Sequence, residues 1–131
     1  GLVMIAGGVG ITPMMSMLRT LAHRRDQRPH RLLVVAGTVD ELLFRGEIRQ
    51  LQQRMDLTVV EVLRRPPPSW IGASGNIDER LLTELLPGKF RRNQLDYFLC
   101  GPHPMLIDVL TVLDRLDVPQ PRIHTEQFDL V

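Results

Sequence analysis

Short apolar runs alternate along this chain with longer stretches in which apolar residues recur every three or four positions. The runs are almost continuously apolar, which is typical of strands buried on both faces of a sheet. They cover residues 2–6, 32–36, 57–63 and 95–100, and residues 122–125 are expected to form a last strand. The periodic stretches predict helices over residues 13–24, 44–55, 81–86 and 105–116.

Strands that alternate with helices predict an α/β fold, here a Rossmann-like open parallel sheet of about five strands with helices on both faces. The pattern does not determine the order of the strands. Three prolines at residues 66–68 predict an extended loop after the third strand, and Asp78 is expected to cap the helix that follows the loop. We treat residues 1–131 as one domain.

Composition excludes several classes of protein. The net charge is only +1 and aromatic residues make up 5% of the chain, which argues against a nucleic-acid-binding surface. The single cysteine cannot form an intrachain disulfide, and the four histidines do not cluster at metal-ligand spacing, so no metal site is expected. No apolar run approaches the length of a membrane span. Because the chain opens inside an apolar run without an initiator methionine, we expect a larger protein with further domains before Gly1.

A glycine-rich turn joins the first predicted strand to the first predicted helix. At this place in a parallel sheet, backbone amides at a helix N-terminus bind phosphate, and glycines let a pyrophosphate approach closely. Thr12 is expected to cap the helix and to donate to phosphate, with Pro13 at the first helical position. The alternative is a tight turn before a well-capped helix, without a ligand. The turn consists of Gly7, Gly8, Val9, Gly10, Ile11, Thr12 and Pro13.

This turn departs from the common G-x-G-x-x-G fingerprint because Pro13 stands where the third glycine would be. No acidic residue directly ends the second strand to hold a ribose diol, since Asp40 and Glu41 come later in the chain. Thr38 and Glu41 are instead expected to form a capping box for the second helix.

A second turn, with the sequence CGPHPM over residues 100–105, closes the fourth long strand and should face the glycine turn across the crevice of the sheet. Together, GGVGITPM and CGPHPM resemble the NAD(P)-binding domain of the ferredoxin–NADP reductase superfamily. The resemblance is strongest to its bacterial ferric-reductase-like and oxygenase-reductase-like flavoproteins. It extends through residues 42–45 in the second predicted helix, residues 64–66 after the third strand, and the closing residues 123–128.

The resemblance implies a flavin-dependent oxidoreductase that delivers hydride from NADPH or NADH to FAD. The FAD would be held mainly by an upstream lobe or subunit absent from this chain, and electrons would pass on to a metal centre, a ferric chelate or a quinone. It also implies a cytoplasmic location, with a membrane only through a missing domain at whose cytoplasmic face this domain would lie. The alternatives are a nucleotide-binding regulatory module or a subunit that docks on a separate flavoprotein, neither with redox activity of its own.

The same resemblance assigns roles to individual residues. Cys100 would lie beside the nicotinamide, and Glu126 and Phe128 beside the flavin. By position alone, Cys100 could equally be a buried thiol without a ligand, Glu126 a solvated carboxylate, and Phe128 a core side chain. Arg64 and Arg65 could contact an adenosine 2′-phosphate, which favours NADPH slightly. The expected cofactor-binding residues are Gly7, Gly8, Val9, Gly10, Thr12, Pro13, Arg64, Arg65, Gly101, Pro102 and Met105.

Overall fold

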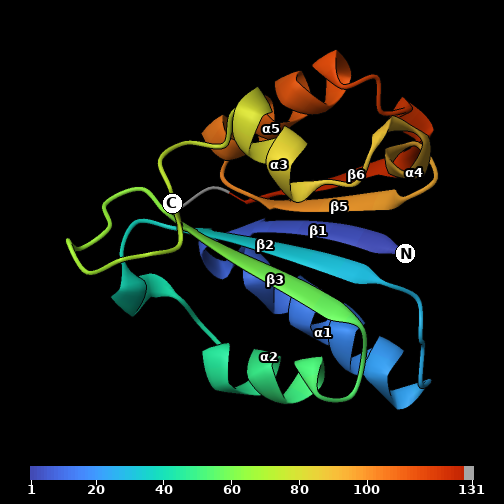
Figure 1. The fold of residues 1–131 in the computed structure, drawn as a ribbon, viewed down its shortest axis with the longest axis horizontal. Coiled ribbons are helices and arrows are strands. Elements are labelled where there is room, and N and C mark those ends of the chain that lie inside the picture. The colour runs from blue at the N-terminus through green and yellow to red at the C-terminus, as the bar shows by residue number, and fades with distance from the viewer. Residues whose placement is uncertain (129–131) are drawn as a thin grey trace.

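The computed structural model describes residues 1–128 and has the predicted α/β architecture (Figure 1). Within these residues, six parallel strands form one open sheet in the order β4-β3-β2-β1-β5-β6. The strands are β1 (Leu2–Gly7), β2 (His30–Ala36), β3 (Leu57–Leu63), β4 (Ala73–Ser74), β5 (Asp96–Gly101) and β6 (Ile123–Gln127). The helices are α1 (Ile11–His23), α2 (Arg45–Gln52), α3 (Glu79–Leu85), α4 (Lys89–Arg92) and α5 (His103–Arg115), with short 3-10 helices at Gly8–Gly10, Val39–Glu41 and Gln120–Arg122.

Helices cover both faces of the sheet, α1 and α2 on one side and α3 and α5 on the other (Figure 1). Strand β1 shows how the apolar runs divide between the two layers. Met4 and Ala6 are buried in the cluster beneath α1 and α2, whereas Val3 and Ile5 are buried in the cluster beneath α3 and α5. A strand whose successive side chains alternate between two buried layers must be apolar throughout, which explains the continuous runs in the sequence.

The prediction of about five strands was one short. Strand β4 lies inside the segment expected to be only a loop, and pairs with the end of β3 through Val62↔Ala73 and Leu63↔Ser74. A strand of two residues is too short to produce an alternating or continuous apolar pattern. The loop expected after β3 therefore extends the sheet by one short edge strand.

The predicted start of the first helix was also wrong. Helix α1 begins at Ile11, with Gly10 as its N-cap, so Thr12 and Pro13 lie within the first turn and Thr12 makes no cap hydrogen bond. The reason is that the glycine turn is itself a 3-10 helix whose backbone is already helical at Gly10, with φ −58° and ψ −15°. The helix thus reaches closer to the end of β1 than the position of Thr12 indicated.

The second helix begins at Arg45 rather than in a capping box at Thr38. Phe44 precedes it in the left-handed region, with φ of 59°, which separates residues 42–43 from the helix. Thr38 makes no side-chain cap, and the Glu41 carboxylate accepts from the backbone N–H of Gly37 at 2.8 Å instead. The expected cap of α3 is confirmed, because the Asp78 carboxylate accepts from the backbone N–H of Leu81 at 2.8 Å.

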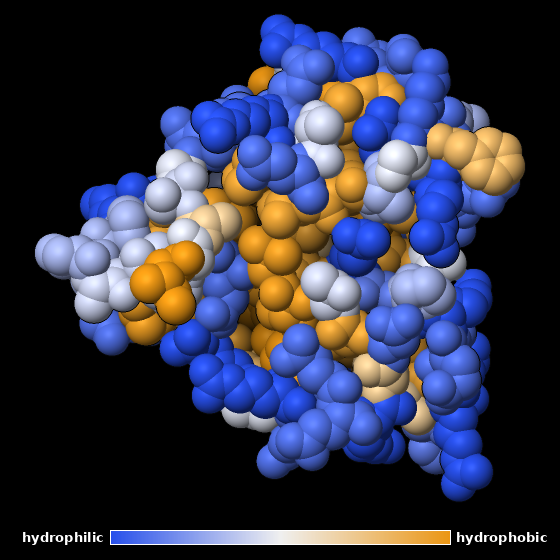
Figure 2. All heavy atoms as spheres, in the orientation of Figure 1, coloured by the Kyte–Doolittle hydropathy of each residue, from blue (hydrophilic) through white to orange (hydrophobic). Residues whose placement is uncertain are grey.

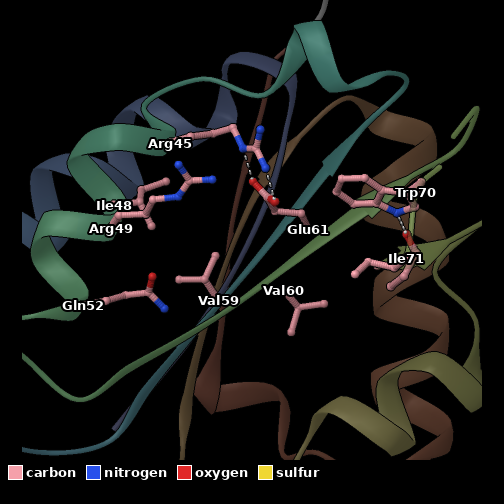
Figure 3. A pocket seen from close by; sticks show the side chains of 11 residues that line it. Arg45, Ile48, Arg49, Gln52, Val59, Val60, Glu61, Trp70 and Ile71 are labelled. Atoms are coloured by element: carbon pink, nitrogen blue, oxygen red, sulfur yellow. Dashed lines mark hydrogen bonds and ion pairs between the residues drawn. The ribbon is translucent and has the colours of Figure 1, made fainter. Parts of the chain in front are cut away.

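Apolar side chains are exposed along the outer side of β3, between the two helix layers (Figure 2). A cavity of about 420 Å³ opens there, lined by α2, by the middle of β3 and by the loop before β4. Figure 3 shows Arg45 and Glu61 paired across its mouth, at 2.8 Å between Nε and Oε2, and Trp70 on the opposite wall. The Trp70 indole donates to the carbonyl of Ala73 at 2.9 Å, so this ring is part of the loop before β4.

Candidate functional site

The glycine turn and the cysteine turn lie next to each other because β1 and β5 are neighbours in the sheet. Their register pairs Ala6 with Cys100, so the two strands end at the same level. From β1 the chain runs through α1 to β2 on one side, while β5 and β6 extend the sheet on the other side. Such a reversal of strand order opens a crevice at the carboxyl ends of the strands, where α/β proteins bind nucleotides.

The glycines of the first turn are needed because other parts of the site come close to them. A Cβ on Gly10 would overlap the carbonyl group of Cys100, and a Cβ on Gly7 would overlap the sulfur of Met105. Gly8 has φ of 58°, and a Cβ there would lie 3.6 Å from the ring of Phe128. The first turn therefore contacts the end of β5, the start of α5 and the residue after β6.

The N-terminus of α1 is left open to a ligand. Its N-cap Gly10 supplies no side chain, and its first turn contains no acidic residue. The backbone N–H of Ile11 donates to the carbonyl of Val9 in the preceding 3-10 helix, and the amides at the start of such a helical segment carry a partial positive charge that favours an anion. Gly8, Val9 and Thr12 are exposed around these amides. The lack of Cβ atoms and of a competing side-chain acceptor fits the pyrophosphate of a dinucleotide.

Cys100 is a buried thiol at the end of β5, with 4% of its surface exposed. Burial raises the pKa of the thiol, and the nearby negative charge of Glu126 raises it further, so the group is neutral at physiological pH. Beside it lies a cavity of about 140 Å³ between α1, β5 and β6, lined in part by Met17, His124 and Glu126. The hydrophobic pattern gave no signal for this cavity, because it forms between elements distant in sequence.

The closing segment reaches the same site. The backbone N–H of Phe128 donates to the carbonyl of Gly101 at 3.3 Å. This bond holds the half-buried side chain of Phe128 beside the glycine turn. His103, at the start of α5, shares a hydrogen bond of 3.0 Å with the Gln127 side chain and so ties α5 to the end of β6. Glu126 is exposed. The structure thus places Phe128 near Gly8 and Glu126 near Cys100, and the positions beside a flavin that the resemblance implies for both residues are still predictions.

Arg64 and Arg65 lie apart from the two turns, at the end of β3. Their backbone amides donate to the carbonyls of Ala36 and Gly37 at the end of β2. The Arg65 guanidinium lies 3.7 Å from the Glu41 carboxylate, which itself holds the backbone N–H of Gly37. An acidic group does therefore stand at the end of β2, contrary to the sequence analysis. It was missed because Glu41 reaches this place only after the chain has turned back through the 3-10 helix at Val39–Glu41.

Two further observations concern metal binding and membrane crossing in the part of the chain that the structure describes. No three His, Cys, Asp or Glu side chains between residues 1 and 128 come together as they would around a metal ion. None of the helices in that range combines the length and the apolar character that crossing a membrane requires. What the site offers is two backbone turns, a neutral thiol and an aromatic side chain, which suits the binding of a planar ring and a phosphate more than acid–base catalysis.

Known proteins are similar to this chain in sequence and in fold. A family model described as the oxidoreductase NAD-binding domain matches residues 4–110. The chain is 32% identical over 138 residues to NADH-cytochrome b5 reductase 1 of Cryptococcus neoformans, covering 99% of this chain and 47% of the relative. It is 31% identical over 128 residues to a flavohemoprotein of Deinococcus radiodurans, covering 96% of this chain and 32% of the relative.

Among solved structures, the flavohem-like FAD/NAD-binding domain of nitric oxide dioxygenase from Vibrio cholerae is similar at a TM-score of 0.85 and 29% identity. The likeness covers 97% of this chain and 50% of that one. The chain spans less than half the length of the sequence relatives named above, at 47% and 32%. The similarity therefore covers one domain of larger proteins.

Proposed function

Because this chain belongs to the oxidoreductase NAD-binding domain family, we propose that it holds NADH or NADPH across its two turns and presents the nicotinamide to an FAD on an adjoining lobe. The observation that carries this proposal is the direct packing of the glycine turn on the cysteine turn, with Gly10 against the Cys100 carbonyl. Hydride transfer requires two rings at contact distance in a site that excludes water, and little proton transfer from the protein.

Each turn has its own part in this function. The exposed amides around Gly8 and the open N-terminus of α1 would bind the pyrophosphate, with the Thr12 hydroxyl donating to one of its oxygens. The nicotinamide would lie against Cys100, Gly101 and Pro102, where a neutral thiol offers a polarizable contact without a competing charge. Phe128, held beside Gly8, would lie beside the flavin ring.

The partner lobe is proposed from the relatives. The Vibrio cholerae structure is of an FAD/NAD-binding domain, and the Deinococcus radiodurans relative is named a flavohemoprotein. By analogy, residues 1–131 form the NAD(P)-binding domain, and an FAD-binding lobe or subunit lies outside them. When bound, FAD supplies the step from a two-electron hydride to single electrons. The acceptor would be a metal centre, a ferric chelate or a quinone, and the domain would act in the cytoplasm, at the face of a membrane if a further domain provides one.

The choice between NADPH and NADH depends on the charges at the ends of β2 and β3. Arg64 and Arg65 could contact a 2′-phosphate, and guanidinium groups suit that contact. The Glu41 carboxylate lies 3.7 Å from the Arg65 guanidinium and would repel the same phosphate. We propose that Arg64, which makes no ion pair within residues 1–128, provides the larger part of any preference for NADPH.

The nucleotide proposal is tested by calorimetric titration of the chain with NADPH, NADH and AMP, with the fluorescence of Trp70 as a second signal. We expect both dinucleotides to bind, AMP to bind more weakly, and Arg64→Ala to weaken NADPH several-fold while leaving NADH unchanged. Absence of binding for all three nucleotides would refute the proposal. Oxidation of NADPH by the full-length protein, with ferric or quinone acceptors, then separates a reductase from a regulatory module, which would bind the nucleotide without oxidising it.

A further inference from the structure

Met105 contacts both turns with one side chain. It is the third residue of α5, and long side chains in a helix point back toward its N-terminus, which here means toward the ends of β1 and β5. A Cβ on Gly7 would overlap the Met105 sulfur, and a Cβ on Gly101 would lie 2.5 Å from its terminal methyl Cε. The sulfur thus lies between the two turns and closest to Gly7, and the methyl group is the atom closest to Gly101.

The space that Met105 fills exists because residues 7 and 101 are both glycines. The position of Cβ on Gly101 is also 3.5 Å from the backbone nitrogen of Gly7, so the two turns are close enough for one side chain to lie against both. The other side of Met105 packs on the apolar cluster beneath α3 and α5. A thioether is flexible and polarizable enough to fill such an irregular gap. Met105 therefore connects the core to both turns at once.

We propose that Met105 is a positioning residue that sets the distance between the glycine turn and the cysteine turn. This inference rests on the proposed function, because that distance would match the span from the pyrophosphate to the nicotinamide of the bound dinucleotide. A small shift in the spacing of two binding groups weakens a ligand that must contact both, whereas a ligand that contacts only one is less affected. Met105 would thus act on the dinucleotide through the backbone of the turns.

The two contacts of Met105 can be separated by substitution. Leucine ends at the position that the methionine sulfur occupies, so Met105→Leu keeps an atom against Gly7 and loses the methyl group against Gly101. Gly7→Ala adds the Cβ that overlaps the sulfur and pushes the side chain away, and Met105→Ala makes room for that Cβ. Met55→Ala is the matched control, because Met55 is buried just before β3, at the opposite end of the strands.

The experiment titrates the chain and these variants with NADH and with ADP-ribose, which lacks the nicotinamide ring. We expect Met105→Ala and Gly7→Ala each to lower the affinity for NADH about ten-fold. The double variant should bind NADH no more weakly than either single variant. Met105→Leu should weaken NADH several-fold and leave ADP-ribose unchanged, a difference that a general loss of stability would not produce. Met55→Ala should lower stability and leave both affinities unchanged.

Several results would overturn the role of Met105. One is wild-type NADH affinity in Met105→Ala, and another is a double variant in which the two single losses multiply. If Met105→Ala does not fold, Met105→Leu decides the question: equal losses of affinity for NADH and for ADP-ribose in that variant would also refute the role of Met105. Failure of the wild-type chain to bind either nucleotide would instead refute the proposed function, so the two failures are distinguishable.

Discussion

The two ends of the parallel strands in this protein are built differently. At the carboxyl ends, glycines pack on backbone, and the N-terminus of α1 has no side-chain cap. At the amino ends, His30 is fully buried and bonded on both sides: it accepts from the backbone N–H of Leu2 at 3.0 Å and contacts Asp26 at 3.0 Å. The carboxyl ends thus carry a helix terminus without a side-chain cap, and the amino end of β2 carries a buried histidine that is bonded through both ring nitrogens.

The N-termini of two helices also differ. Asp78 caps α3 with its own carboxylate, whereas the N-cap of α1 is Gly10, which has no side-chain acceptor. A capped terminus adds stability to the fold, and an open terminus can bind an anion from outside. The comparison teaches that the ligand site of this protein is marked by backbone groups that no side chain caps, whereas the scaffold is marked by backbone groups that side chains do cap. Four substitutions would test this distinction, in order of expected effect.

The largest effect is expected from Gly10→Ala. The new Cβ would overlap the Cys100 carbonyl, which belongs to the backbone of β5 and cannot move aside. We expect a loss of about 1–3 kcal/mol in the free energy of unfolding and a loss of NADH binding greater than ten-fold. Gly46→Ala is the control, since nothing lies within 4 Å of its Cβ position in α2, and we expect it to be neutral or slightly stabilising. Thermal unfolding and calorimetry would measure both; unchanged binding in Gly10→Ala would contradict the close packing of the turns.

An intermediate effect is expected from His30→Leu, at the other end of the strands. The substitution removes the acceptor for the Leu2 N–H, which should lower the free energy of unfolding by about 1–3 kcal/mol at pH 7 and leave NADH affinity unchanged. Denaturant unfolding gives the first quantity, and the NADH titration the second. An exposed histidine in the last turn of α1, replaced in His23→Ala, provides the control.

His30 also makes stability depend on pH. Burial lowers the pKa of His30 below its ordinary 6.5, although Asp26 partly opposes the shift. The unfolded chain then binds more protons than the folded one, so the free energy of unfolding should fall as the pH drops below about 6.5. The hydrogen bond from Arg28 holds the pKa of Asp26 far below its usual value. Because the unfolded chain protonates this carboxylate first, the free energy of unfolding continues to fall in stronger acid. His30→Leu should flatten the first part of this curve, and an unchanged slope between pH 7 and 5 would rule out His30 as its source.

The smallest effects are expected from a pair of exposed positions at the two helix N-termini. Thr12→Val removes a hydroxyl that makes no cap bond, so stability should change by less than about 0.5 kcal/mol while NADH binding weakens several-fold. Asp78→Ala should do the reverse, with a loss of about 1 kcal/mol in stability and unchanged binding. If Thr12→Val lowers stability as much as Asp78→Ala does, the Thr12 hydroxyl caps α1 and the N-terminus of that helix is not open.

Predictions from the sequence succeeded where a local signal was strong. The continuous apolar runs predicted four of the five longer strands, and the last strand was expected separately over residues 122–125. Asp78 was recognised as a cap because its cap bond closes within one turn of its own helix. Predictions failed where the chain bends back on itself. Thr12 and Thr38 looked like caps by residue type, yet the backbone at Gly10 and the left-handed Phe44 shift both helix starts. Glu41 reaches the end of β2 only through such a bend.

The amino-acid order alone determined the longer strands, the approximate positions of the longer helices and the two turns, because hydrophobic periodicity and the dihedral freedom of glycine and proline are properties of a few neighbouring residues. Only the tertiary structure decided that β1 lies beside β5, that Met105 contacts both turns, and that Phe128 returns to Gly8. These contacts join residues far apart in the chain. They depend on the order of the strands, which an all-buried, uniformly apolar pattern does not encode, since any such strand could be a neighbour of any other.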